Sequence, residues 1–137
     1  MNLPRSVARV ASGYARVALG AAFLSGIASR FGLWGKGVGY GNFQAFEQYT
    51  AEVNAFMPRL TRPFLAWAAT AAELGLGLLL LLGVWRRPVA LASAALLLIF
   101  ALAMALSLGI KSPLDYSVFS ASAAALLLAT GDETGTK

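Results

Sequence analysis

Glu73 is the residue best placed to do chemistry, because it is a single carboxylate inside a long apolar run, residues 69–88 (ATAAELGLGLLLLLGVWRRP). A charge at depth in a bilayer is expensive, so an intramembrane carboxylate is a functional candidate. It can remain there protonated or paired with a cation. We predict that Glu73 faces the interior of a helix bundle. Two roles are open for it. In the functional role, Glu73 is the catalytic group, which accepts a proton or orients a ligand. In the structural role, it only holds the helices together.

The composition indicates that this apolar run lies in a membrane. Apolar residues make up 58% of the chain and charged residues 12%, against about 25% charged in an average soluble domain. The absence of cysteine and histidine excludes disulfides, thiolate or imidazole metal sites and Cys/His or Ser/His catalysis, so no metal site and no covalent cofactor are expected. The net charge of +5 comes from basic residues at the ends of apolar runs, which excludes a nucleic-acid stripe and suits a lipid bilayer.

Four apolar segments predict an all-α, integral membrane four-helix bundle in a single domain, residues 1–137. The expected spans cover about 10–28, 63–85, 88–109 and 113–130. Pro63, Pro88 and Pro113 mark the starts of the last three, since proline is favoured in the first turn of a helix. An even number of spans places both termini on one side. The basic N-terminus and the Arg86–Arg87 turn favour the cytoplasmic side of the cell (inner) membrane.

The long connection between the first two spans begins with a glycine-rich stretch, SRFGLWGKGVGYGNF. It lacks the pattern of a phosphate-binding loop, so we expect a flexible loop with Trp34 and Tyr40 at the membrane interface. A short amphipathic helix is predicted at about 42–57 from its spaced aromatic residues. Its polar face carries Glu47 and Glu52, whereas membrane-surface helices usually carry basic residues there. We expect it to cover the outer mouth of the bundle as a lid, with simple lodging in the interface as the alternative.

Arg16 is the cation expected within a span, and two arrangements are open for it. It can pair with Glu73, because their heights in antiparallel helices differ by roughly 6 Å. It can instead snorkel to the surface, because side chains lean toward the N-terminus of their own helix and these two would lean apart. Around Glu73 and Arg16 we expect Tyr14, Phe64 and Trp67 to form the walls of a ligand-binding pocket.

Asp115 and Tyr116 lie at the start of the fourth apolar segment. Ser112 as N-cap with Asp115 three residues later resembles a capping box, and Asp suits the positive end of a helix. The alternative is a binding role, in which Lys111, Asp115 and Tyr116 line the outer mouth under the lid.

Three blocks of the sequence resemble the DoxX family of small membrane proteins. They are an Arg-bearing first helix (YARVALGAAFLSGIASRFG), the block AAELGLGLLLLLGVWRRPVAL and the closing SPLDYSVFSASAAALLLA. In the central block, Glu73, Gly77, Gly83, Arg87 and Pro88 are similar to the E…G…G…RP signature of the family. The resemblance implies a four-helix membrane bundle. Some relatives are membrane subunits of a thiosulfate:quinone oxidoreductase, others associate with redox or thiol-stress enzymes, and related branches act in amine-dehydrogenase maturation.

These observations lead to a leading expectation and two alternatives. We expect a membrane subunit of a redox system that binds a lipophilic molecule such as a quinone within its bundle, next to a redox enzyme subunit. Cysteine chemistry used by any relative cannot operate here, since the chain has no cysteine. The alternatives are a small proton-linked transporter or exporter of a lipophilic or weakly acidic compound, which would require a homo-oligomer, and a purely structural membrane anchor or assembly factor.

Overall fold

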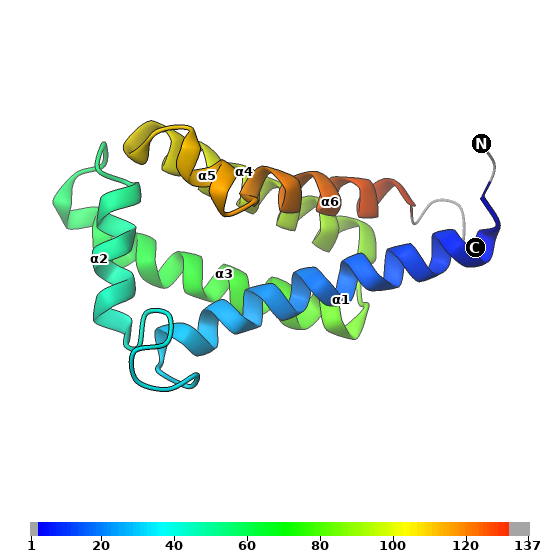
Figure 1. Cartoon of the computed structure of the whole chain (residues 1–137), viewed down its shortest axis with the longest axis horizontal. Helices are drawn as coiled ribbons and strands as arrows, with labels where there is room; N and C mark the ends of the chain where they lie inside the picture. The colour runs from blue at the N-terminus through cyan, green and yellow to red at the C-terminus, as the bar shows by residue number, and fades with distance from the viewer. Residues whose placement is uncertain (1–2, 132–137) are drawn as a thin grey trace.

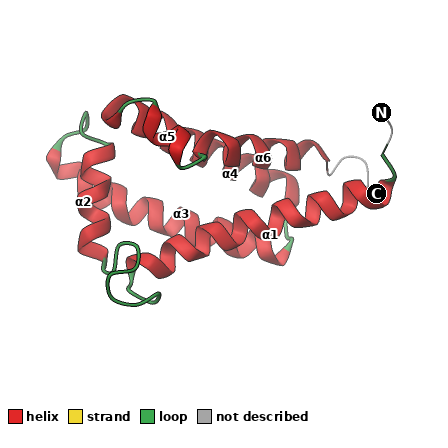
Figure 2. Ribbon diagram, viewed as in Figure 1, coloured by secondary structure: helices red, strands yellow, loops and turns green. Residues whose placement is uncertain are grey.

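A computed structural model describes residues 3–131, and every regular element among them is helical (Figures 1 and 2). The expected all-α class is therefore confirmed. The elements in chain order are α1 (Arg5–Arg30), α2 (Phe43–Val53), a 3-10 turn (Arg59–Thr61), α3 (Arg62–Leu82), α4 (Arg86–Leu108), α5 (Lys111–Asp115) and α6 (Val118–Gly131).

Length and hydropathy identify the helices that can cross a membrane. Within the described residues, three are long and apolar enough, namely Arg5–Arg30, Arg59–Leu82 and Arg86–Leu108, and the shorter Val118–Gly131 is also apolar. The fourth apolar segment differs from the single continuous helix expected from the sequence. Ser117 adopts a left-handed conformation, φ +57°, which a helix interior does not accommodate, so this segment is divided into α5 and α6.

The helices form two pairs closed at one end by α2. Helix α1 packs along α3, and α4 packs along α6. Figure 1 shows α2 lying across the left end of both pairs, at the end opposite the N-terminus. The buried apolar core lies where the two pairs meet, and it includes Leu19 and Phe23 of α1, Leu80 of α3 and Val89 of α4.

Glycines allow α1 and α3 to pack at short range. A Cβ at Gly20 would lie 3.0 Å from the carbonyl oxygen of Gly77, and a Cβ at Gly77 would lie 3.1 Å from Phe23 and Leu24. Small residues at such positions let helix backbones approach closely in a membrane. This contact fixes the antiparallel register, because Gly20 is opposite Gly77 while Gly26 is opposite Glu73.

Small residues also form the interface between α4 and α6. Ala90, Ala94 and Ala125 are buried there. The Ser122 hydroxyl donates a hydrogen bond to the carbonyl oxygen of Ala94 at 2.7 Å. Interhelical hydrogen bonds of this kind average about 0.6 kcal/mol in membranes, so close packing contributes most of the stabilisation of this pair.

The glycine-rich stretch folds back onto the end of α1. The backbone N–H of Tyr40 donates to Ser29 Oγ at 2.8 Å, and that of Gly41 donates to Ser29 O at 3.1 Å. Gly39 has φ +63°, and a Cβ there would clash with the Ser29 hydroxyl. Glycine is required at such a position because both the left-handed backbone and the close approach exclude a side chain. The stretch thus delivers the chain to the start of α2 beside the end of α1.

Candidate functional site

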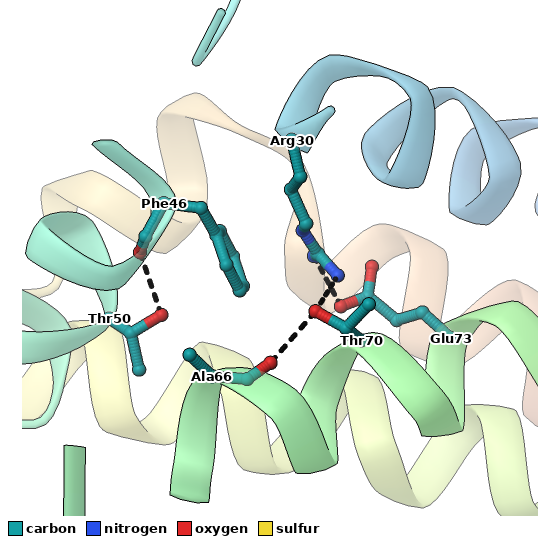
Figure 3. A network of polar contacts seen from close by, with 6 residues as sticks. All are labelled: Arg30, Phe46, Thr50, Ala66, Thr70 and Glu73. Atoms are coloured by element: carbon teal, nitrogen blue, oxygen red, sulfur yellow. Dashed lines mark hydrogen bonds and ion pairs between the residues drawn. The ribbon is translucent and has the colours of Figure 1, made fainter. Parts of the chain in front are cut away.

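Glu73 points into the bundle, as expected from the sequence, and it forms an ion pair with Arg30 (Figure 3). Arg30 Nη2 donates to Glu73 Oε2 at 2.5 Å, and the two side chains are only 5% and 8% exposed. Arg30 is the last residue of α1, and Glu73 lies in the middle of α3. The pair therefore connects two helices and is buried in the helix bundle.

Thr70 completes the polar part of the site. Arg30 Nη1 donates to Thr70 Oγ1 at 3.0 Å, and the Thr70 hydroxyl donates in turn to the carbonyl oxygen of Ala66 at 2.8 Å. Thr70 and Glu73 are three residues apart and share one face of α3, the buried face that continues to Gly77. The close contact at Gly77 holds this face against α1, which positions both acceptors for one guanidinium group.

Of the two arrangements left open for Arg16, the pair with Glu73 is wrong, because the partner of Glu73 is Arg30. Side chains lean toward the N-terminus of their own helix. Arg30, at the C-terminal end of α1, leans into the bundle, and Glu73 leans toward the same end from α3. The two therefore lean toward each other, whereas Arg16 and Glu73 would lean apart.

Arg16 instead binds the opposite end of α3. Its Nη1 donates to the carbonyl oxygens of Leu80 and Leu81, at 2.9 and 3.1 Å. These carbonyls belong to the last turn of α3, where acceptors lack partners within the helix and the helix dipole is negative. Arg16 thus acts as a C-terminal cap, and it neither reaches Glu73 nor simply snorkels.

Phe46 of α2 covers the ion pair. Its ring centroid lies 3.7 Å from the guanidinium carbon of Arg30, a cation–π contact that is strongest where water is excluded. Thr50, one turn later, donates to the carbonyl oxygen of Phe46 at 2.9 Å. The position of α2 in Figure 1 and the contact of Phe46 with Arg30 show that the amphipathic helix packs across the end of the bundle, as a lid would.

Phe46 belongs to a connected set of aromatic side chains from four segments. Phe43 stacks on Trp67 of α3 with ring centroids 4.1 Å apart, and Phe31 stacks on Phe43 at 5.5 Å. Tyr40 lies edge-on to Phe46 at 5.2 Å. We call this set the aromatic layer: Phe31, Tyr40, Phe43, Phe46, Tyr49 and Trp67. Of this layer, Phe46 contacts the Arg30–Glu73 pair directly, through the guanidinium of Arg30.

Tyr40 is the member of the layer whose ionisation is most perturbed. Burial, and to a smaller extent the neighbouring phenol of Tyr49, raise its pKa to about 12. Burial also raises the pKa of Tyr49, and the phenol of Tyr116 adds to that effect. Both phenols therefore stay neutral at physiological pH, where they can donate and accept hydrogen bonds without adding charge above the ion pair.

Two polar atoms of the pair are not engaged by the described residues. Arg30 Nε is buried and has no hydrogen-bond partner among residues 3–131, although such groups are normally paired. Hydrogen bonds from this part of the chain reach Glu73 Oε2 but not Oε1. A Cβ at Gly26 would lie 3.6 Å from Oε1, so Gly26 of α1 lies next to this oxygen. The pair thus retains one donor and one acceptor.

Of the three residues predicted to form the pocket walls, Trp67 lies near the site, whereas Tyr14 and Phe64 do not. Trp67 belongs to the aromatic layer, about 9 Å before Glu73 along α3. Tyr14 and Phe64 are 77% and 71% exposed on the outside of the bundle, so neither lines the Arg30–Glu73 site. For Tyr14 the reason is the register of α1, which places it beyond the Arg16 cap and opposite the buried face.

Asp115 and Tyr116 are also separated from the ion pair. The capping-box prediction is wrong: α5 begins at Lys111, its N-cap is Ile110 without a side-chain cap, and Asp115 instead pairs with Lys111 Nζ at 2.6 Å on the surface. Tyr116 is 71% exposed, yet its phenol lies close enough to Tyr40 and Tyr49 to affect their ionisation.

Sequence reasoning missed Arg30, Thr70 and Phe46 as members of the site. Arg30 lies beyond the predicted first span, 10–28, although its lean into the bundle follows from its position at a helix C-terminus. Thr70 carries a usable signal, since it lies three residues before Glu73 on the same helix face. Phe46 is one of the spaced aromatic residues of the amphipathic helix, and its contact with Arg30 depends on the loop that positions α2.

Comparison with known proteins identifies the family of the chain. A sequence model of the DoxX family matches residues 6–108, which include Arg30, Phe46, Thr70 and Glu73. The fold defines an integral membrane bundle, and the chain belongs to the DoxX family. No curated protein and no solved structure matches the chain significantly.

Proposed function

We propose that this DoxX protein is a membrane subunit of a redox system, and that it binds a lipophilic molecule such as a quinone at the Arg30–Glu73 pair. The observation that carries the proposal is a charged pair enclosed in apolar helices, with a donor, Arg30 Nε, and an acceptor, Glu73 Oε1, that the described residues leave unengaged. Small-molecule sites are typically apolar with a few convergent polar groups.

The residues of the site fit a quinone. Arg30 would donate a hydrogen bond to a ring carbonyl, and Glu73 would accept or return a proton. The aromatic layer would provide flat apolar surfaces next to the pair and exclude water from it. A bound quinone supplies reversible electron and proton transfer, which the side chains of this chain lack, since it has no cysteine to hold a cluster and no histidine to hold haem.

A second candidate is a structural assembly factor, and the completeness of the Arg30 contacts favours it. Arg30 binds Glu73, Thr70 and the Phe46 ring at once, so the pair joins α1, α2 and α3 whether or not a ligand binds. In that case replacement of both charges by apolar residues would leave the function of the protein intact, because well-packed apolar residues can substitute for a buried ion pair.

Tryptophan fluorescence distinguishes the two candidates. Two variants in lipid nanodiscs are compared. Trp34→Phe/Trp85→Phe retains Trp67, which lies near the site. Trp34→Phe/Trp67→Phe retains Trp85, which lies about 18 Å beyond Glu73 along the axis of α3. Titration with a short-tailed benzoquinone should quench Trp67 saturably. Trp85 should be quenched only in proportion to the quinone dissolved in the lipid.

The charges are then tested in the Trp67-only background. Arg30→Met/Glu73→Leu should weaken the saturable component at least about tenfold, since a hydrogen bond to a charged group contributes about 1.5–3 kcal/mol. Equal, linear quenching of both tryptophans, or an unchanged affinity in this variant while circular dichroism shows an intact helical fold, would rule out quinone binding at the pair.

A further inference from the structure

Two arginines converge at the end of the bundle opposite the lid. Gly83, the C-cap of α3, has φ +75°. A Cβ at this position would lie 3.0 Å from Arg16 Nη1 and 3.8 Å from Arg86 Nε. Both guanidinium groups therefore lie beside the same backbone position, and the missing side chain of Gly83 lets Arg16 approach it closely.

The two arginines differ in what they bind. Arg16 uses Nη1 for the carbonyl oxygens of Leu80 and Leu81, and hydrogen bonds within residues 3–131 do not engage its Nε or Nη2. Arg86 is exposed and forms no hydrogen bond or ion pair with the described residues. Five or more N–H donors of the two arginines are thus left near the Gly83 turn. The negative C-terminal end of the α3 dipole compensates only the charge of Arg16, which contacts it.

The surroundings of this pair are cationic. Arg9 lies on the same face of α1 as Arg16, seven residues earlier and about 10 Å along the axis, and it is exposed. The carboxylates of the described residues lie elsewhere, on α2, in the ion pair with Arg30 or in the pair with Lys111: Glu47, Glu52, Glu73 and Asp115. Within residues 3–131, Arg16 and Arg86 thus lie together without a carboxylate partner, an arrangement that suits an anionic ligand.

Apolar surface adjoins the two guanidinium groups. Leu82 and Val84, on either side of Gly83, are 72% and 40% exposed, and Trp85 is 70% exposed. Exposed tryptophan at the end of a spanning helix is typical of the headgroup level of a bilayer. A free phosphate would use the arginines alone, whereas a phospholipid would also cover these apolar side chains with its acyl chains.

We infer that Arg16 and Arg86 bind the phosphate of an anionic phospholipid at the Gly83 turn, with Arg9 adding to the attraction. This site is independent of the Arg30–Glu73 pair and of the ligand proposed there. The lipid would fix the depth of the end of α3 in the membrane. Arg16 also caps that end, so lipid binding and the contact between α1 and α3 would support each other.

Lipid retention measured by native mass spectrometry tests this site. The protein is purified in mild detergent, exchanged with equal amounts of phosphatidylglycerol and phosphatidylcholine, and the bound lipids are counted. Each basic residue near an anionic surface contributes roughly fivefold in affinity. We expect the wild type to prefer phosphatidylglycerol, and Arg86→Gln to lose about fivefold of that preference.

Two variants and one ligand control complete the experiment. Arg5→Gln removes the same charge at the same end of the bundle, about 16 Å from Arg16 along α1, and should change the preference less than twofold. Arg86→Lys keeps the charge and should retain most of it. Inorganic phosphate in place of lipid should not raise the melting temperature in phosphatidylcholine discs. The inference fails if the wild type shows no preference, if Arg5→Gln and Arg86→Gln have equal effects, or if phosphate alone reproduces the effect of the lipid.

Discussion

Removal of one partner of the Arg30–Glu73 pair should destabilise the protein far more than removal of both. The two side chains are 5% and 8% exposed, so Glu73→Leu would leave a buried guanidinium with only Thr70 and the Phe46 ring. Breaking a buried pair in this way costs about 3–5 kcal/mol, whereas apolar replacement of both partners is often neutral. The double variant Arg30→Met/Glu73→Leu should therefore recover most of the loss, which gives a coupling energy of at least about 2 kcal/mol.

Reversible unfolding in mixed micelles measures this coupling through a double-mutant cycle. The exposed pair Lys111–Asp115, with side chains 85% and 54% exposed, provides a matched control. Its cycle, Lys111→Met and Asp115→Leu, should give only about 0.3–0.5 kcal/mol, as is usual for exposed pairs on a helix. Additive effects of Arg30→Met and Glu73→Leu, within about 0.5 kcal/mol, would refute the assignment of Arg30 as the partner of Glu73.

Three further predictions follow from the helix contacts and the loop. Gly77→Ala should lower the free energy of unfolding by about 1–3 kcal/mol, because the added Cβ would lie 3.1 Å from side-chain atoms of α1. Gly75→Ala is the control: its added Cβ would have no neighbour within 4 Å, so it should be neutral or stabilising in the same unfolding assay. Equal effects of the two substitutions would contradict the close approach of α1 and α3 at Gly77. Gly83→Ala should lower the free energy of unfolding by about 1–2 kcal/mol, because alanine would have to adopt a left-handed backbone conformation. It should also displace Arg16, which limited proteolysis would detect as faster cleavage at this turn. Unchanged cleavage would contradict the role of Arg16 as a cap of α3. Absorbance titration at alkaline pH should show a tyrosine with a pKa of about 12 that is missing in Tyr40→Phe. Since this pKa is raised by folding, the stability it contributes is present below pH about 10 and is lost as the pH rises through about 12; a normal titration in both proteins would contradict the burial of Tyr40.

Much of the fold is predictable because membranes impose simple rules on a sequence. A span needs a long apolar run, so α1, α3 and α4 could be predicted from hydropathy alone. The spacing of Phe43, Phe46 and Tyr49 similarly predicts α2, because an amphipathic helix requires that periodicity. Glu73 could be found because a carboxylate inside an apolar run has few inexpensive explanations.

The partner of Glu73 was not predictable by counting residues from the span ends. Helix register depends on which small residues allow close approach, here Gly20 against Gly77, and on how far α1 extends beyond the apolar run. Helix α1 extends beyond its apolar run at both ends. In the resulting register, Arg16 lies at the end of α3 and Arg30 reaches Glu73. The direction in which side chains lean opposed the Arg16 pair, and that argument outweighs the similar depths of Arg16 and Glu73.

The measurement that tests the proposed function most directly is mass spectrometry of the small molecules that copurify with the protein in lipid nanodiscs or mild detergent. Wild-type protein and Arg30→Met/Glu73→Leu would be purified from the same membranes in parallel. We expect a quinone in near-stoichiometric amount with the wild type and at least about tenfold less with the double variant, at equal helical content. Bulk phospholipid alone in the wild type, or equal quinone in both proteins, would contradict the assignment of the Arg30–Glu73 pair as a quinone site.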